Sequence, residues 1–128
     1  MEKLITIQKR EKLNDIYVVD EKSNGGANHR YIINKKDITT WQDGSNTIGM
    51  CADIRFQKGP RNEKDSIDGV IDTDLLEIVK HRLQCFQQGE FATRENAIAL
   101  THIEEALMWL NLRIENRLEK GILGTNVK

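Results

Sequence analysis

The sequence has few of the residues that mark secreted, membrane-spanning or metal-binding proteins. Its 128 residues include only two cysteines, one proline and three histidines. Cys51 and Cys85 form no CxxC pair, which argues against a disulfide framework or a zinc site. No apolar run approaches the roughly 18 residues that a membrane span needs, and the N-terminus lacks the apolar core of a secretory signal. We therefore expect a cytoplasmic protein that needs no metal or cofactor and binds no membrane.

The chain also lacks an excess of charge of either sign. Lys and Arg number 19 and Asp and Glu number 20, which gives a formal net charge of −1. General binders of nucleic-acid polymers carry a basic surplus, so no such polymer is expected as a partner. A length of 128 residues suits one compact domain, or one core with an appendage, and excludes a large multidomain enzyme.

The first half of the sequence alternates apolar and polar residues with the period of a half-buried strand. The clearest run extends from Ile48 to Phe56, and shorter β-branched runs cover residues 15–20 and 29–34. Turn residues at 23–26 and 42–46 separate such runs. Further candidates for a strand are Ile5 and Ile7. We expect a small antiparallel β-domain over residues 1–60, followed by a connector over 61–72.

The second half, residues 73–128, changes to helical spacing. Apolar residues recur every three or four positions over about 73–88 and again over about 94–119. Residues suited to begin or end these helices are Asp72, Thr73, Gly89, Thr93 and Gly121. A connection this short makes the two helices antiparallel. The expected fold class is α+β, with a small N-terminal antiparallel β-domain followed by a two-helix antiparallel hairpin that oligomerises.

The longer helix carries two apolar stripes. The first stripe consists of Leu100, Ile103, Leu107, Leu110 and Ile114, and the second consists of Ala99, Ala106 and Trp109. The shorter helix covers only one of them, and a helix with two apolar faces needs two partners. A second copy of the chain, related by two-fold symmetry, is the simplest partner. We therefore expect a homodimer at least.

The tip of the hairpin gathers groups that suit a nucleotide. Phe86 can stack a base, Asn96 can bond a base edge or a ribose hydroxyl, and the free N–H groups at the start of the second helix favour an anion. A structural interpretation stays open, in which Phe86 and Phe91 close the hairpin core and Asn96 serves the helix cap.

Two arginines stand one turn apart near the end of the longer helix. Arg113 and Arg117 can clamp a diphosphate, or they can serve as ordinary partners of the helix dipole. Asn96 and Arg113 are 17 residues apart, which corresponds to about 25 Å of helix rise. One small nucleotide can touch both only between two chains. Head-to-tail packing of two long helices would create two equivalent pockets, and loss of the dimer should then abolish binding.

Two blocks of the sequence resemble a known family. The run from Arg94 to Leu110, followed by Arg113, Arg117 and the segment 121–125, resembles the helical hairpin shared by the Thoeris anti-defence sponge and the anti-CBASS cyclic-oligonucleotide sponge of phages. The upstream segments 25–31 and 54–60 look like the Thoeris branch, whose members carry a small β-domain before the hairpin.

The resemblance implies a sponge that acts in the cytoplasm of the infected bacterial host. It would sequester glycocyclic ADP-ribose, the signal of Thoeris TIR-domain enzymes, without degrading it. The residues that the resemblance assigns to the ligand are Phe86 on the adenine, Asn96 on the adenine or its ribose, and Arg113 and Arg117 on the phosphates, with Arg94 and Thr125 as further candidates. Four other matches to family motifs, without an assigned role, are Asn28, His29, Gln57 and Gly59.

Several points stay open at this stage. Some relatives form hexamers and bind cyclic di- or trinucleotides at separate sites. The sequence does not distinguish a dimer from a hexamer, and it shows neither whether CBASS oligonucleotides bind nor which linkage isomer is preferred. The alternative from the enzyme class is a phosphodiesterase that cleaves the cyclic nucleotide near His29. The alternative from the structural class is a hairpin that only mediates assembly.

Overall fold

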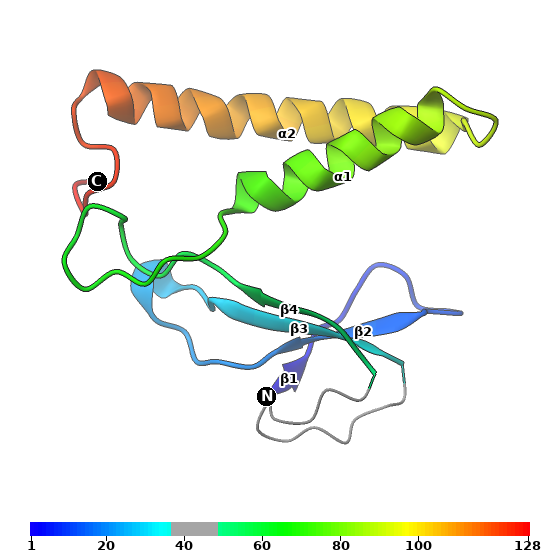
Figure 1. Cartoon of the computed structure of the whole chain (residues 1–128), viewed down its shortest axis with the longest axis horizontal. Helices are drawn as coiled ribbons and strands as arrows, with labels where there is room; N and C mark the ends of the chain where they lie inside the picture. The colour runs from blue at the N-terminus through cyan, green and yellow to red at the C-terminus, as the bar shows by residue number, and fades with distance from the viewer. Residues whose placement is uncertain (37–48) are drawn as a thin grey trace.

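A four-stranded antiparallel sheet and a two-helix hairpin make up the part of the chain that the structure describes, residues 1–36 and 49–128 (Figure 1). The structure is a computed structural model. It confirms the expected fold class, because a small antiparallel β-domain precedes an antiparallel helical hairpin. The turn expected at 42–46 and the first residue of the run from Ile48 lie outside the described residues.

The sheet is a meander in which each strand pairs with the next one along the chain. Strands β1 (Glu2–Lys3), β2 (Asn14–Val18), β3 (Arg30–Lys35) and β4 (Met50–Arg55) lie in that order. Residues 24–26 between β2 and β3 form a short 3-10 turn, η1 (Asn24–Gly26), in which two glycines adopt φ angles of 71° and 79°. The expected turn at 23–26 is confirmed, because glycine reaches positive φ without steric cost.

The prediction of a strand at Ile5 and Ile7 is wrong. Both side chains are almost fully exposed, at 91% and 100%, and β1 lies earlier, at Glu2–Lys3. The hydroxyl of Thr6 donates to the carbonyl of Gln8 (3.0 Å), and the side-chain amide of Gln8 donates to two carbonyls further along. Such local side-chain bonds compete with a strand ladder, so alternation of apolar residues alone did not form a strand here.

The two faces of the sheet are buried to different degrees. On one face Tyr17 and Ile32 are opposite each other in the register and form the buried core, against which Val19 and Met50 pack. The other face is turned toward the helices and is apolar but mostly half-buried. Its half-buried side chains are Ile16, Tyr31, Ile33, Ile54 and Phe56, and Val18 on the same face is buried.

The hairpin consists of α1 (Asp72–Gln87) and the longer α2 (Arg94–Glu119). Thr93 caps α2 as expected, because its hydroxyl accepts the N–H of Asn96 at 3.0 Å, and Gly121 ends the helix region with a φ of 69°. The predicted N-cap of α1 is wrong. Ile71 is its N-cap rather than Asp72 or Thr73, and the carboxylate of Asp74 accepts the N–H of Ile71 at 2.9 Å.

Neither helix contains a fully buried residue in the single chain. The two helices pack against each other near the tip and diverge toward the start of α1 (Figure 1). Among the described residues, no strand of the sheet comes within an 8 Å Cα distance of either helix. The β-domain is therefore joined to the hairpin through the segment 56–71 and the C-terminal residues, which lie at the end where the helices diverge (Figure 1).

Candidate functional site

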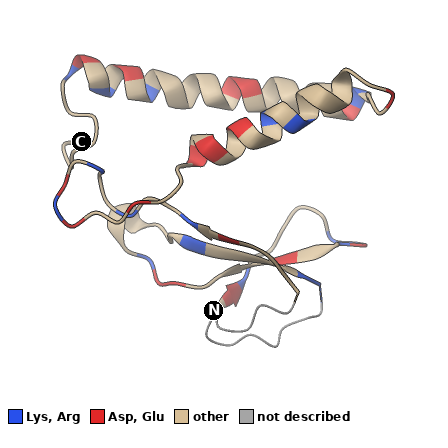
Figure 2. Cartoon of the chain, in the orientation of Figure 1, with Lys and Arg blue, Asp and Glu red and all other residues tan. Residues whose placement is uncertain are grey.

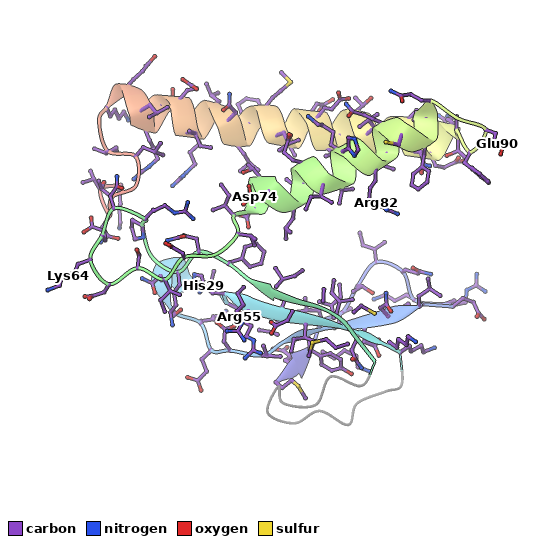
Figure 3. All side chains as sticks on the ribbon, viewed as in Figure 1. His29, Arg55, Lys64, Asp74, Arg82 and Glu90 are labelled. Carbon is purple, nitrogen blue, oxygen red and sulfur yellow. The ribbon has the colours of Figure 1, made fainter. Side chains whose placement is uncertain are left out.

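The tip of the hairpin presents an aromatic ring beside a cation. Phe86 is 39% exposed, and the guanidinium of Arg82 lies 5.5 Å from the centre of its ring, from one turn earlier on α1. Arg82 points away from the body of the hairpin in Figure 3. The exposed part of the ring can stack against a planar group. The sequence pattern gave no reason to single out Arg82.

The loop at the tip is held by its own side chains, which leaves other groups without internal partners. The amide of Gln87 accepts the N–H of Thr93 (3.1 Å) and donates to the carbonyl of Thr93 (3.2 Å). Asn96 contributes its backbone N–H to the helix cap. Over residues 1–36 and 49–128, the side chains of Asn96 and Arg94 form no hydrogen bond or ion pair with the protein. These two side chains can therefore meet a ligand.

The opposite end of α2 carries the two predicted arginines in different environments. Arg117 is half-buried, and its Nη2 atom donates to the carbonyls of Ile122 (3.0 Å) and Thr125 (3.1 Å). Arg113 is exposed, and no hydrogen bond or ion pair engages it within the described part of the chain. The structure thus makes Arg113 a free cation, whereas one nitrogen of Arg117 is committed to the C-terminal turn.

A cleft of about 610 Å³ lies where the helices diverge. Its walls come from the connector, the first turn of α1, the last turns of α2 and the C-terminal turn. The predicted residues that line it are Gln57, Gly59, Arg113, Arg117 and Thr125. Its volume is within the range of about 300–1,000 Å³ that is usual for sites of small ligands. The predicted residues at the tip, Phe86, Arg94 and Asn96, do not line this cleft.

The charge of the cleft is mixed. Figure 2 shows acidic residues at the start of α1, and Asp72 and Asp74 at this position also line the cleft that Arg113 and Arg117 line. Acidic side chains at a helix start are favoured by the helix dipole. The arginines can therefore bind an anion, while the acidic wall favours a group that donates hydrogen bonds.

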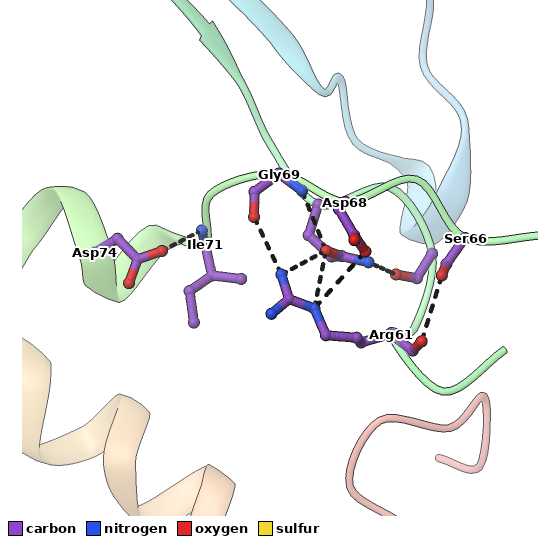
Figure 4. Close-up of polar contacts among 8 residues, drawn as sticks. Arg61, Ser66, Asp68, Gly69, Ile71 and Asp74 are labelled. Carbon is purple, nitrogen blue, oxygen red and sulfur yellow. Dashed lines mark hydrogen bonds and ion pairs between the residues drawn. The ribbon is translucent and has the colours of Figure 1, made fainter.

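The connector forms a third wall and is tightly bonded rather than loose (Figure 4). The side-chain oxygen of Gln57 accepts from Arg61 Nη2 (2.9 Å), Arg61 Nε (3.3 Å) and the N–H of Gly69 (3.2 Å). Arg61 Nη2 also donates to the carbonyl of Gly69 (3.3 Å). Arg61 lines the cleft as well. No sequence pattern indicates this residue, because its partners come from both sides of an irregular loop.

Asn28 and His29 lie in a neighbouring cavity of about 460 Å³, between the half-buried face of the sheet and the start of α1. The amide of Asn28 donates to the carbonyl of Asp20 (2.8 Å), and the ring Nδ1 of His29 lies 3.1 Å from the hydroxyl of Ser23. Partial burial opposes ionisation of Asp20, but hydrogen bonds from the backbone N–H groups of His29 and Arg30 keep its pKa below the ordinary value. These residues therefore stabilise the loop before β3.

A second ionic cluster lies on the sheet and away from both cavities. Arg30 donates two hydrogen bonds to the carboxylate of Asp53, at 2.9 and 3.1 Å, and Arg55 approaches the same carboxylate at 3.4 Å. The hydrogen bond from Arg30 is the main cause of a lowered pKa of Asp53. Figure 3 shows Arg55 on the sheet, remote from the hairpin. This cluster joins β3 to β4.

The described residues provide neither a cluster suited to a metal ion nor a helix suited to a membrane. No group of three or more His, Cys, Asp or Glu side chains in this part of the chain is placed to bind a metal ion. None of the described helices has the length and apolar character required to cross a membrane.

A small β-domain followed by a helical hairpin, with two arginines in a cleft where the helices diverge, defines the class of protein. Residues 52–115 match the family model described as the Acb2/Tad1 hairpin domain, and the chain belongs to this family. Within it, the chain is similar to "Thoeris anti-defense 1" of Bacillus phage SBSphiJ7, with 44% identity over 95 residues. The match covers 74% of this chain and 63% of the relative, so the chain spans less than two thirds of that protein. The family predicted from the sequence is confirmed.

Proposed function

We propose that this chain is a phage anti-defence sponge that binds glycocyclic ADP-ribose in the host cytoplasm and sequesters it without cleavage. The observation that carries the proposal is the free guanidinium of Arg113 beside Arg117 in a cleft of about 610 Å³. Three N–H donors of Arg117, on Nε and Nη1, have no partner in the described part of the chain. Arginine is suited to phosphate because its planar donors can bond two oxygens at once.

The ligand's base would be bound by a second copy of the chain. Phe86 and Asn96 lie at the tip, and Asn96 is about 25 Å along α2 from Arg113. A single chain therefore cannot apply both ends to one nucleotide. Head-to-tail pairing of two α2 helices brings the tip of one chain to the cleft of the other. The exposed apolar side chains of Met108 (70%) and Trp109 (72%) in the middle of α2 support such pairing.

Simple energetics support sequestration. A ligand of about 35 non-hydrogen atoms at roughly 0.3 kcal/mol per atom gains about 10 kcal/mol on binding, which corresponds to a Kd of tens of nanomolar. Helices and a hydrogen-bonded connector present the ligand groups, so little ordering is needed on binding. A tight and preorganised site suits a sponge, because sequestration depends on affinity rather than on turnover.

Calorimetry with glycocyclic ADP-ribose tests the proposal directly. The native chain should bind it with a Kd of about tens of nanomolar, and Arg113→Ala should weaken binding by about 100-fold or more, because each charge-assisted bond to phosphate is worth about 1.5–3 kcal/mol. The matched control is Arg10→Ala, which removes an exposed arginine far from the cleft in sequence and should change nothing. Full binding by Arg113→Ala would remove Arg113 from the site.

The fate of the ligand separates the sponge from the alternatives. The complex is heated until the protein denatures, and the released nucleotide is identified by mass spectrometry. Intact glycocyclic ADP-ribose supports sequestration, whereas linear products would identify a phosphodiesterase. If the native chain binds no nucleotide, the result would favour the structural alternative, in which the hairpin only mediates assembly. The same assay with cyclic di- and trinucleotides of CBASS tests the broader ligand range.

A further inference from the structure

The C-terminal turn and the connector lie side by side at the end of α2 (Figure 1). The N–H of Asn62 donates to the carbonyl of Gly124 at 3.0 Å, and its side-chain Nδ2 donates to the carbonyl of Leu123 at 3.4 Å. The N–H of Asn126 donates to the carboxylate of Glu63 at 3.4 Å. No described strand comes within an 8 Å Cα distance of a helix, and these bonds tie the β-domain's connector to the end of the hairpin opposite the tip.

The contact between these two segments depends on a glycine. Gly124 has a φ of 80°, and a Cβ atom at this position would lie 2.6 Å from Nδ2 of Asn62 and 3.0 Å from its Cγ. A glycine therefore allows Asn62 to rest directly on the backbone of the C-terminal turn.

The same turn fixes one edge of the Arg117 guanidinium. Its carbonyls at Ile122 and Thr125 both accept from Nη2 of Arg117. The turn is closed by the N–H and the hydroxyl of Thr125, which both donate to the carbonyl of Ile122, at 3.2 and 2.6 Å. Since the guanidinium is planar, fixing Nη2 also sets the direction of the free donors on Nε and Nη1.

We propose that Asn62 is a positioning residue for the anion site: it holds the C-terminal turn, and the turn aims Arg117 into the cleft. This role rests on the proposed function. It differs from a ligand contact, because the hydrogen bonds of Asn62 go to backbone carbonyls of the turn. Arg113, which has no such support, supplies charge, whereas Arg117 supplies direction.

The physical reason lies in the geometry of arginine. Bidentate bonding to a phosphate requires the plane of the guanidinium to be set within about 10–20°. If the turn is released, Arg117 must be ordered by the ligand itself, and the cost appears as lost affinity. Removal of an orienting partner of this kind typically costs about 10-fold in affinity or more, as is known for groups that orient metal ligands.

The experiment is a double-mutant cycle on the full chain, with Kd for glycocyclic ADP-ribose measured by calorimetry. The single variants are Asn62→Ala, Asn62→Leu and Arg117→Ala. Asn62→Leu keeps the side-chain volume but loses the side-chain donor to Leu123, while the backbone N–H remains. The exposed neighbour Lys64, seen on the connector in Figure 3, provides the control Lys64→Ala. We expect either Asn62 variant to raise Kd about 10-fold in the native background and to add no further loss to Arg117→Ala.

A second readout follows the turn itself. Backbone hydrogen exchange at Thr125 and Asn126 should become faster in Asn62→Ala without ligand, while the exchange of α2 stays unchanged. A structural effect alone would instead lower the melting temperature and weaken binding to the same extent in both backgrounds.

Each outcome decides a separate question. If Asn62→Ala reduces the affinity by the same factor in the native and the Arg117→Ala backgrounds, the positioning role is overturned. An unchanged Kd together with unchanged hydrogen exchange at Thr125 would also overturn it. Absence of binding by the native chain would overturn the proposed function and, with it, this role for Asn62. Binding by the native chain with an additive cycle overturns only the role of Asn62.

Discussion

Replacing Trp109 with alanine should separate the copies of the chain and abolish ligand binding. A tryptophan side chain presents about 150–250 Å² that can be buried, and 72% of Trp109 is exposed in the single chain. The area that a partner can still cover is therefore about 110–180 Å², worth roughly 3–4 kcal/mol at 25 cal/mol per Å². Coverage of only half that area still contributes about 1.5–2 kcal/mol per copy.

Symmetry doubles this effect, because both copies of a two-fold dimer carry the change. The loss of about 3–4 kcal/mol weakens the dimer by two to three orders of magnitude. Sedimentation equilibrium at micromolar concentration should show the native chain assembled and Trp109→Ala as a monomer. Calorimetry with glycocyclic ADP-ribose at the same concentration should show binding only for the assembled chain.

The matched control is Ile67→Ala, which removes an exposed apolar side chain (59%) from the connector rather than from α2. This variant should stay assembled. A monomeric Trp109→Ala variant that binds glycocyclic ADP-ribose as tightly as the native chain would refute the shared pocket, since the tip of one chain could no longer reach the cleft of another. An assembled Trp109→Ala variant would refute the interface.

Three other predictions follow from single contacts. Phe86→Ala should raise Kd for glycocyclic ADP-ribose about 5- to 150-fold by loss of about 1–3 kcal/mol of stacking; Phe86→Trp should retain binding in calorimetry, and equal loss from both would contradict stacking. Because the pKa of Asp53 is lowered on folding, its pair with Arg30 stabilises the fold above the ordinary carboxylate pKa, and this stabilisation is lost as the pH falls through the lowered pKa. Urea unfolding should show Arg30→Gln less stable than the native chain by about 0.2–1 kcal/mol at neutral pH. This difference in stability should narrow in acid, and a difference that does not change with pH would refute the linkage. Gly69→Ala places a Cβ 2.5 Å from backbone atoms at the end of β4 and should lower the melting temperature by about 4 °C or more. The control Gly89→Ala, whose Cβ would lie 4.0 Å from the nearest atom, should keep the native melting temperature. Equal melting temperatures of the two variants would refute the steric argument.

The parts of the fold that depend on neighbouring residues could be predicted from the sequence. Thr93 accepts an N–H three residues away, and the two glycines of η1 need only their own φ angles. The cap of α1 lies one position before Asp72 and two before Thr73, because Asp74 acts backward on the N–H of Ile71 and no local rule favours isoleucine at an N-cap.

The cleft could be predicted only in part. Arg113 and Arg117 share a helix face through their spacing, so their proximity is a local property. Arg61 lines the same cleft from an irregular connector, and Asn62 on that connector bonds to the C-terminal turn. Their partners at Gly69 and Gly124 are fixed by the tertiary structure rather than by spacing. No periodicity in the sequence encodes such contacts.

The close approach of Asn62 to Gly124 has a consequence for how such chains diverge. The two positions are far apart in sequence but occupy adjoining space, so any side chain gained at 124 displaces the amide at 62. Drift at one site is therefore tolerated only with compensation at the other, and a chain that lost this glycine should also show a smaller residue where asparagine stands here.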